Sequence, residues 1–191
     1  MEISIKERKA AARKAAKEKI NALPVGYREA ADAEIAKKII SLPEYKSADT
    51  VFCFVSMPGE INTRPVIINA LDAGKTVCVP KCSDEPGIMH CFEIRSYDDL
   101  ETGKFGIREP KEGCRPVPPE EIGFAVVPCC AAGRSGQRLG FGGGYYDRYL
   151  EHADFPRALI CRERIMLDEV PEDEHDLRFS IVISEEKIYR L

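Results

Sequence analysis

The sequence predicts an α/β protein of three layers, in which a mostly parallel sheet carries helices on both faces. Short apolar runs of about five residues, such as residues 50–55 and 124–128, are typical of strands buried on both sides. Helical patterns alternate with these runs, and such alternation gives right-handed crossovers between parallel strands. Because 191 residues suit one domain, we expect a single α/β domain over residues 1–191.

The expected elements follow one another along the chain. The first helix is ended by Pro24 and Gly26, and Pro43 and Gly74 end two others. Helices are expected over residues 3–23, 27–42, 64–73 and 142–151. Strands are expected over residues 50–55, 76–80, 88–94, 124–128, 158–161, 180–184 and 187–190. Residues 89–119 interrupt the alternation, and we expect an inserted hairpin there, with a loop over residues 103–110.

Composition excludes several classes of protein. Hydrophobic residues make up 44% of the chain and charged residues 31%, which fits a globular protein rather than a disordered one. No apolar run is long enough for a membrane-spanning helix. The net charge of -4 argues against a nucleic acid as the main partner. The sequence leaves the oligomeric state open and is compatible with a monomer.

The eight cysteines bear on the compartment. No Cys-x-x-Cys pair occurs, and the three histidines do not complete a cluster of zinc ligands. The N-terminal residues lack the apolar core and cleavage site of a secretory signal. We therefore expect reduced thiols and a cytoplasmic protein.

The first twenty residues are rich in lysine and arginine, with seven of these against three glutamates. Alanines with spaced charges favour a helix. By pattern alone, a solvated surface helix is as good an interpretation as a helix whose cations reach an anionic ligand.

A glycine-rich segment over residues 133–147 follows a buried strand and opens a helix. Backbone N–H groups in such a turn approach phosphate closely, and Arg134 and Arg138 would add positive charge. Asp147 lies just after them, where a carboxylate would suit Mg²⁺ beside phosphates. Neither the P-loop pattern nor G-x-G-x-x-G fits, because Tyr145 stands where the latter needs its third glycine. The segment thus indicates an anion cradle of another type, and a flexible loop is the alternative.

A second candidate segment, SMPGEINTR over residues 56–64, also follows a buried strand. Ligands of open α/β sheets bind at the carboxyl ends of the strands, so Glu60 and Thr63 are expected to face the same crevice as the glycine-rich segment. An unremarkable exposed acid is the alternative for Glu60.

At this point several motifs together resemble one family. RLGFGGGYYDRYL (residues 138–150) resembles the signature of the 5-formyltetrahydrofolate cyclo-ligases, also called 5,10-methenyltetrahydrofolate synthetases. SMPGEINT, FGIREP (residues 105–110), Lys9-x-x-x-Arg13 and His175-Asp176 resemble its other motifs, in the family's order. The resemblance covers nearly the whole chain, and the first motif is the most specific.

The resemblance implies an α/β enzyme that uses ATP and Mg²⁺ to close 5-formyltetrahydrofolate to 5,10-methenyltetrahydrofolate, with ADP and phosphate released. In the family's proposed route, the formyl oxygen takes the γ-phosphoryl group before N10 attacks. Carried over by position, the ATP-binding residues are Lys9, Arg13, Arg138, Leu139, Gly140, Phe141, Gly142, Gly143, Gly144, Tyr145 and Tyr146. The folate-binding residues are Val55, Glu60, Phe141, Gly142, Gly143, Gly144 and Tyr145. The Mg²⁺ ligands are Asp147 and Asp176.

Two departures from the family pattern bear on activity. Gly133 stands where the family usually has Asp, and Arg164 replaces a common Gln. A relative that binds folate or nucleotide without turnover is therefore a second hypothesis. A thiol enzyme that uses Cys129 and Cys130 is a third, although neither has an evident base nearby. An RNA-binding basic helix is a fourth, and the acidic remainder of the chain opposes it.

Overall fold

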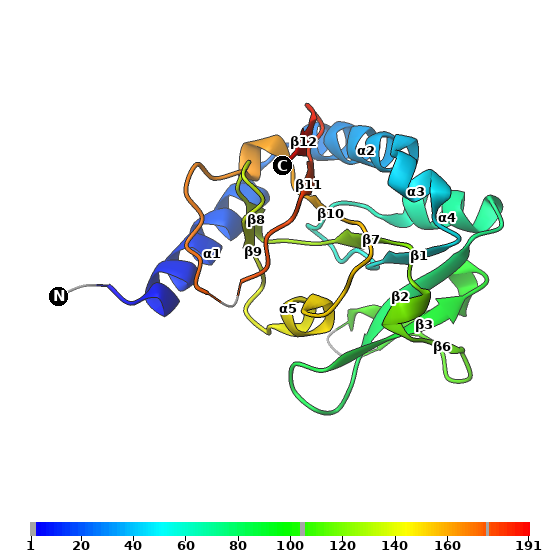
Figure 1. Ribbon diagram of the computed structural model, residues 1–191. Coiled ribbons are helices and arrows are strands. Elements are labelled where there is room, and N and C mark those ends of the chain that lie inside the picture. The colour runs from blue at the N-terminus through cyan, green and yellow to red at the C-terminus, as the bar shows by residue number, and fades with distance from the viewer. Residues whose placement is uncertain (1–2, 104–105, 175) are drawn as a thin grey trace.

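The computed structural model describes residues 3–103, 106–174 and 176–191. Its central feature is an eight-stranded sheet with the order β12-β11-β10-β7-β1-β2-β3-β6 (Figure 1). The strands are β1 (Thr50–Cys53), β2 (Thr76–Cys82), β3 (Met89–Ile94), β6 (Pro116–Val117), β7 (Phe124–Val127), β10 (Arg157–Ile160), β11 (Ile181–Ile183) and β12 (Ile188–Arg190). From β11 through β2 all neighbours are parallel, whereas β12, β3 and β6 pair antiparallel at the two edges. The expected α/β class is confirmed.

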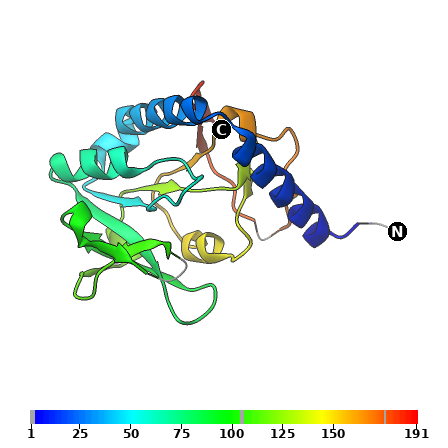
Figure 2. The same ribbon diagram turned by 180° about the vertical axis from the view of Figure 1, so that it is seen from behind.

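Helices pack on both faces of the sheet (Figures 1 and 2). One face carries α2 (Val25–Ser41), α3 (Pro43–Ser47) and α4 (Arg64–Asp72), and the other carries α5 (Tyr145–Leu150). Successive β1 residues alternate between two cores, with Val51 and Cys53 in one and Phe52 in the other. Because both faces are covered, the central strands read as continuous apolar runs.

The helix α1 (Ile5–Ala22) stands across the carboxyl end of the sheet, beside the small sheet of β8 (Ala131–Ala132) and β9 (Arg138–Leu139) (Figures 1 and 2). A capping box between Ser4 and Glu7 begins the helix. Ala16 is its single buried residue, so α1 has a small apolar anchor.

Two stretches differ from expectation. Residues 103–110 are not loop throughout, because β5 (Arg108–Pro110) pairs with β4 (Leu100–Thr102). Helix α5 begins three residues later than expected, since Gly142 and Gly144 have φ of 101° and 69°, which a right-handed helix does not accept. Its six residues make only a weak dipole, so side-chain cations carry more of any attraction for anions.

The remaining short elements are 3₁₀ turns, at η1 (Tyr97–Asp99), η3 (Pro119–Glu121) and η4 (Glu163–Ile165). The eight cysteines are all free thiols. Within the described ranges, no helix is long and apolar enough to cross a bilayer.

Ala16→Leu should loosen α1, because a larger side chain at a fully buried contact is overpacked by about 1–3 kcal/mol. Thermal and denaturant unfolding would measure the loss. Ala15→Leu is the matched control, since Ala15 is exposed on the same helix and should accept leucine with little change. Equal losses for both variants would show that α1 does not dock through Ala16.

Candidate functional site

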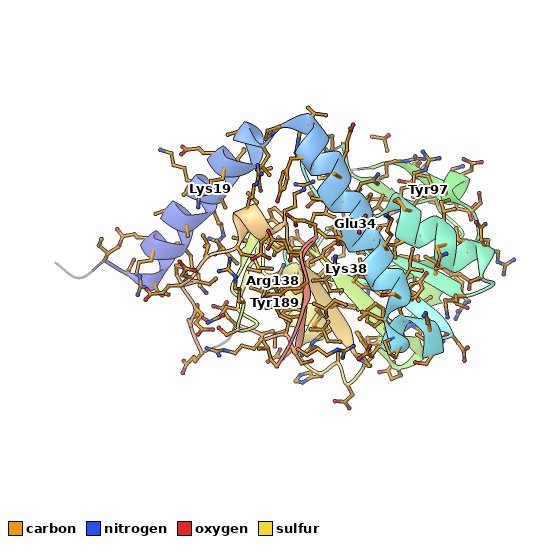
Figure 3. The ribbon with its side chains drawn as sticks, turned by 90° about the horizontal axis from the view of Figure 1, so that it is seen from above. Lys19, Glu34, Lys38, Tyr97, Arg138 and Tyr189 are labelled. Carbon is orange, nitrogen blue, oxygen red and sulfur yellow. The ribbon has the colours of Figure 1, made fainter. Side chains whose placement is uncertain are left out.

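Two adjoining cavities lie at the carboxyl edge of the sheet. The larger has a volume of about 380 Å³ and the smaller about 160 Å³. They share Arg138, Gly140, Gly144 and Asp147, so the glycine-rich loop after β9 forms the boundary between them. Seen from above, Arg138 lies on the side of the molecule toward α1, and Tyr97 lies on the opposite side (Figure 3).

The glycine-rich loop divides its residues between the two cavities. Leu139 and Gly142 line the smaller one, whereas Phe141, Gly143, Tyr145 and Tyr146 line the larger. A side chain at Gly140 would meet the guanidinium of Arg138, because an added Cβ would lie 2.7 Å from Nη1. Glycine at this position therefore lets the backbone run against the arginine, as a close approach to an anion requires.

Helix α1 brings two cations to the smaller cavity. Lys9 and Arg13 are four residues apart and so lie on one face of the helix. The Nε of Arg13 donates to the carbonyl of Gly140 at 2.7 Å, which fixes the loop to the helix. The Nζ of Lys9 pairs with Asp173 at 2.6 Å and Asp176 at 2.5 Å. Burial would lower the pKa of Lys9, but these two carboxylates raise it overall, so the amine stays charged.

Arg138 is the cation that both cavities share. Its side chain is 4% exposed, and its Nε donates to the carbonyl of Pro128 at 2.8 Å. Its Nη1 lies 3.1 Å from Oδ1 of Asp147, and its guanidinium lies over the ring of Tyr146 at 5.2 Å. These contacts hold a positive charge at the junction of the two cavities.

The two candidate metal ligands face one cavity. Asp147 and Asp176 both line the smaller cavity, and each is paired with a cation of that cavity. In the part of the chain that the structure describes, no group of three or more His, Cys, Asp or Glu is arranged to hold a metal by itself. Two carboxylates fit Mg²⁺ when phosphates and water complete its octahedron.

Glu60 lines the larger cavity together with Val55 and Met57. The backbone N–H of Met57 donates to Oε2 of Glu60 at 2.8 Å. Burial raises the pKa of the Glu60 carboxyl, and the bond from Met57 opposes that rise. The structure thus places Glu60 at the crevice, as expected, and the alternative of an unremarkable exposed acid does not hold.

Two expectations about site residues are wrong. Thr63 is fully buried and donates to the carbonyl of Phe54 at 2.7 Å, so it supports the loop and does not face the crevice. Arg134 adds no charge to the glycine-rich cradle, because it pairs with Glu163 and Asp168 outside the cavities.

The two departures also lie away from the cavities. Gly133 lies at the β8–β9 turn, where an added Cβ would be 2.3 Å from the side-chain oxygen of Gln137. Arg164 stacks over the ring of Tyr27 at 4.1 Å. Neither residue lines the larger or the smaller cavity, so neither changes the charge there. Phe105 and His175, which belong to two of the motifs, lie outside the described residues.

Sequence reasoning missed Arg162 and Asp32. Arg162 follows β10 and is buried, with its guanidinium bonded to the carbonyls of Gly59 and Glu60 and to the carboxylate of Asp32. A charged residue directly after a buried strand is a local signal for the crevice. Asp32 has no such signal, because it is one of several acids on α2.

A cationic, glycine-rich cavity beside a larger cavity, at the carboxyl edge of such a sheet, is typical of α/β proteins that bind small molecules. The pattern of the 5-formyltetrahydrofolate cyclo-ligase family matches residues 5–185. The chain therefore belongs to this family.

Individual relatives agree with that assignment. A probable 5-formyltetrahydrofolate cyclo-ligase of Schizosaccharomyces pombe is 31% identical over 173 residues, which cover 82% of this chain and 84% of the relative. The 5-formyltetrahydrofolate cyclo-ligase of Mycolicibacterium smegmatis is 34% identical over 146 residues, covering 72% and 74%. The solution structure of Aquifex aeolicus 5,10-methenyltetrahydrofolate synthetase superposes with a TM-score of 0.82 at 30% identity, covering 95% of this chain and 92% of that one.

The thiols beside the site should be chemically inert. A hydrogen bond with Cys161 and burial raise the pKa of Cys129, and burial raises that of Cys130. Because the thiolate is the nucleophile, raised pKa values oppose thiol chemistry. The double variant Cys129→Ala with Cys130→Ala should lower stability at most, with turnover per folded molecule nearly unchanged. A folded but inactive double variant would contradict this and support a thiol enzyme.

Proposed function

We propose that this chain catalyses the ATP-dependent closure of 5-formyltetrahydrofolate to 5,10-methenyltetrahydrofolate, with release of ADP and phosphate. The observation that carries the proposal is that the two cavities of this family member meet at Arg138. Reduced folate occupies the larger cavity and the ATP phosphates occupy the smaller, so the γ-phosphate meets the formyl group at their junction. The reaction takes place within one domain of a cytoplasmic protein.

The chemistry requires the formyl oxygen to become a leaving group. That oxygen attacks the γ-phosphorus, the bond to ADP breaks, and the formyl carbon then carries a phosphate. N10 attacks that carbon, the C–O bond breaks so that inorganic phosphate departs with the oxygen, and the N10 proton is released as the ring closes. Phosphoryl transfer asks a protein mainly for positioning and charge neutralisation. Lys9, Arg13 and Arg138 supply the positive charge on the phosphate side.

The larger cavity suits the folate. Val55, Met57, Phe141 and Tyr145 give it a largely apolar wall, with Glu60 as an acceptor. The edge of a pterin presents N–H donors, which a carboxylate binds in charge-assisted hydrogen bonds. Phe141 is 53% exposed although it lines this cavity, which leaves its ring area to be covered by a ligand.

The donor set of the smaller cavity suits Mg²⁺. Asp147 and Asp176 would hold the ion, and the phosphates and water would complete its shell. When bound, Mg²⁺ offsets the charge that the phosphates carry. In the ligand-free protein Asp176 neutralises Lys9, and Asp147 neutralises Arg138. Metal and phosphates together let each pair exchange partners, so we expect ATP to bind poorly without Mg²⁺.

Coupling of the two half-reactions tests the proposal. Purified protein with ATP, Mg²⁺ and 5-formyltetrahydrofolate should form the methenyl product, measured by its absorbance, with one ADP for each product molecule. Without the folate, ADP should not accumulate. Folded protein that binds both ligands without product would support a binding protein instead, and ADP release that ignores the folate would contradict the coupling.

Glu60→Gln should weaken folate binding by roughly 10- to 150-fold, because a charge-assisted hydrogen bond is lost, which costs about 1.5–3 kcal/mol. ATP affinity should hardly change. Calorimetric titration with each ligand would measure both. Loss of ATP affinity with folate affinity intact would contradict the assignment of the larger cavity.

The same variant has a stability signature. The pKa of Glu60 is higher in the folded protein than in the unfolded chain. Ionisation of its carboxyl therefore lowers the free energy of unfolding as the pH rises through the folded-state pKa. Below the unfolded-state pKa of about 4.3 this loss is absent. Glu60→Gln should therefore unfold at a higher temperature than the parent at pH 7, and the difference should vanish near pH 4. A lower melting temperature at pH 7 would contradict the stated cause of the pKa shift.

Asp147→Asn or Asp176→Asn should lower turnover by orders of magnitude with the fold retained, since both carboxylates lie at a cavity edge. In each variant, half-maximal turnover should require a higher concentration of Mg²⁺. Asp173→Asn is the control, because Asp173 also pairs with Lys9 but does not line the smaller cavity. Near-parental turnover in Asp147→Asn, with only a slightly lower melting temperature, would contradict metal binding by Asp147. The carboxylate would then only stabilise the first turn of α5 through the helix dipole.

A further inference from the structure

A buried ion pair lies behind the loop that carries Glu60. Arg162 follows β10, and its side chain is 4% exposed; Asp32 lies on α2, and its side chain is 12% exposed. The guanidinium binds the carboxylate in a bidentate manner, with Nε 2.7 Å from Oδ1 and Nη2 2.9 Å from Oδ2. The pair thus joins the end of a central strand to a helix on the face of the sheet.

The guanidinium of Arg162 also donates two hydrogen bonds to the loop that carries Glu60. Nη1 donates to the carbonyl of Gly59 at 3.0 Å, and Nη2 donates to the carbonyl of Glu60 at 2.9 Å. The carboxylate of Asp32 also accepts the backbone N–H of Asn62 at 3.0 Å. The main chain of the loop is therefore bonded to this one pair at Gly59, at Glu60 and at Asn62.

The loop needs such support because its backbone is unusual. Gly59 has a φ of 95°, in the left-handed region that a turn before Glu60 requires. Among the described residues, the Glu60 side chain has one hydrogen bond, from the backbone N–H of Met57. The direction of the Glu60 carboxylate thus depends on how the backbone from Met57 to Asn62 is held.

The charge of Asp32 explains why Arg162 can bond to the loop without forming an ion pair with the carboxylate of Glu60. Asp32 neutralises the guanidinium, so Arg162 contacts the main chain of Glu60 and not its carboxylate. Among the described residues, no cation forms an ion pair with Glu60. The carboxylate stays available to a ligand of the larger cavity. Buried ion pairs add little net stability, which leaves geometry as the main effect of this one.

We propose that Arg162, held by Asp32, is a positioning residue that fixes Glu60 for the donor-bearing edge of the folate. This inference rests on the proposed function. It assigns Arg162 no contact with either substrate; it acts through the main chain of residues 59 and 60.

The primary test is Arg162→Lys, which keeps the charge beside Asp32 but cannot reproduce the fork of donors to the loop. KM for 5-formyltetrahydrofolate should rise about tenfold or more, whereas KM for ATP should stay within about twofold. Arg164→Gln is the matched control, since Arg164 is two residues away and stacks on Tyr27 instead. Equal rises in both KM values would overturn the proposal and indicate general damage to the fold.

A double-mutant cycle separates positioning from a purely structural role. If Arg162 acts through Glu60, Arg162→Lys should add little to the loss of folate affinity when Glu60 is already glutamine. Additive losses in Arg162→Lys, Glu60→Gln and the double variant would overturn the proposal. If the lysine variant folds poorly, Asp32→Asn replaces it in this cycle, because it alters the other partner of the same ion pair. It should likewise add little to the loss of folate affinity in Glu60→Gln.

Amide exchange in the ligand-free protein tests the loop without any substrate. Arg162→Lys should speed hydrogen exchange at the amides of Met57 and Asn62 at least tenfold, with β1 and β7 unchanged. Unchanged exchange at both amides would overturn the positioning. If the loop loosens as expected but the parent protein neither binds nor converts the folate, the proposed function fails while the structural link stands.

Discussion

Both cavities depend on how a single guanidinium is held. Arg138 is nearly inaccessible, and a buried charge is tolerated only where it is paired and hydrogen-bonded. Its partners come from two places: Pro128 at the end of β7, and helix α5 through both the carboxylate of Asp147 and the ring of Tyr146. The glycine at position 140 is required by the same arrangement, because any side chain there would displace the arginine. The charge is thus fixed before a ligand arrives, which is the condition for effective electrostatic stabilisation of a transferring phosphoryl group.

Around that arginine, the site is assembled from oppositely charged pairs. Lys9 with Asp176 and Arg138 with Asp147 balance two of the three cations that line the smaller cavity, and Arg162 with Asp32 forms a further pair behind the larger cavity. The two kinds of pair differ in what surrounds them. The first two pairs border the smaller cavity, whereas the third is bonded to the main-chain carbonyls of Gly59 and Glu60. In the proposed reaction, the first two pairs exchange partners with the metal and the phosphates. The third pair keeps the loop that carries Glu60 in place.

Local patterns predicted much of this arrangement, and they failed where the outcome depends on tertiary contacts. The apolar runs of β1 and β7 and the glycines after β9 were identifiable because each follows from burial or backbone conformation at that position. Arg134 and Arg138 share one glycine-rich segment, yet the β8–β9 hairpin directs the first to Glu163 and the second inward. Thr63 follows Glu60 by three residues and turns into the core to bond Phe54. No local signal marks Asp32, whose partner is 130 residues away along the chain.

The attachment of α1 has a consequence for folding during synthesis. Lys9 and Asp176 pair with each other at the smaller cavity, so two segments that are far apart in the sequence meet in its wall. Domains emerge from the ribosome N-terminal part first, and α1 has a single buried residue with which to dock early. Lys9 therefore lacks its carboxylate partners, Asp173 and Asp176, until those residues have been translated. The strands from β1 to β10 precede Asp176 in the sequence, so this part of the sheet can form before the smaller cavity is complete.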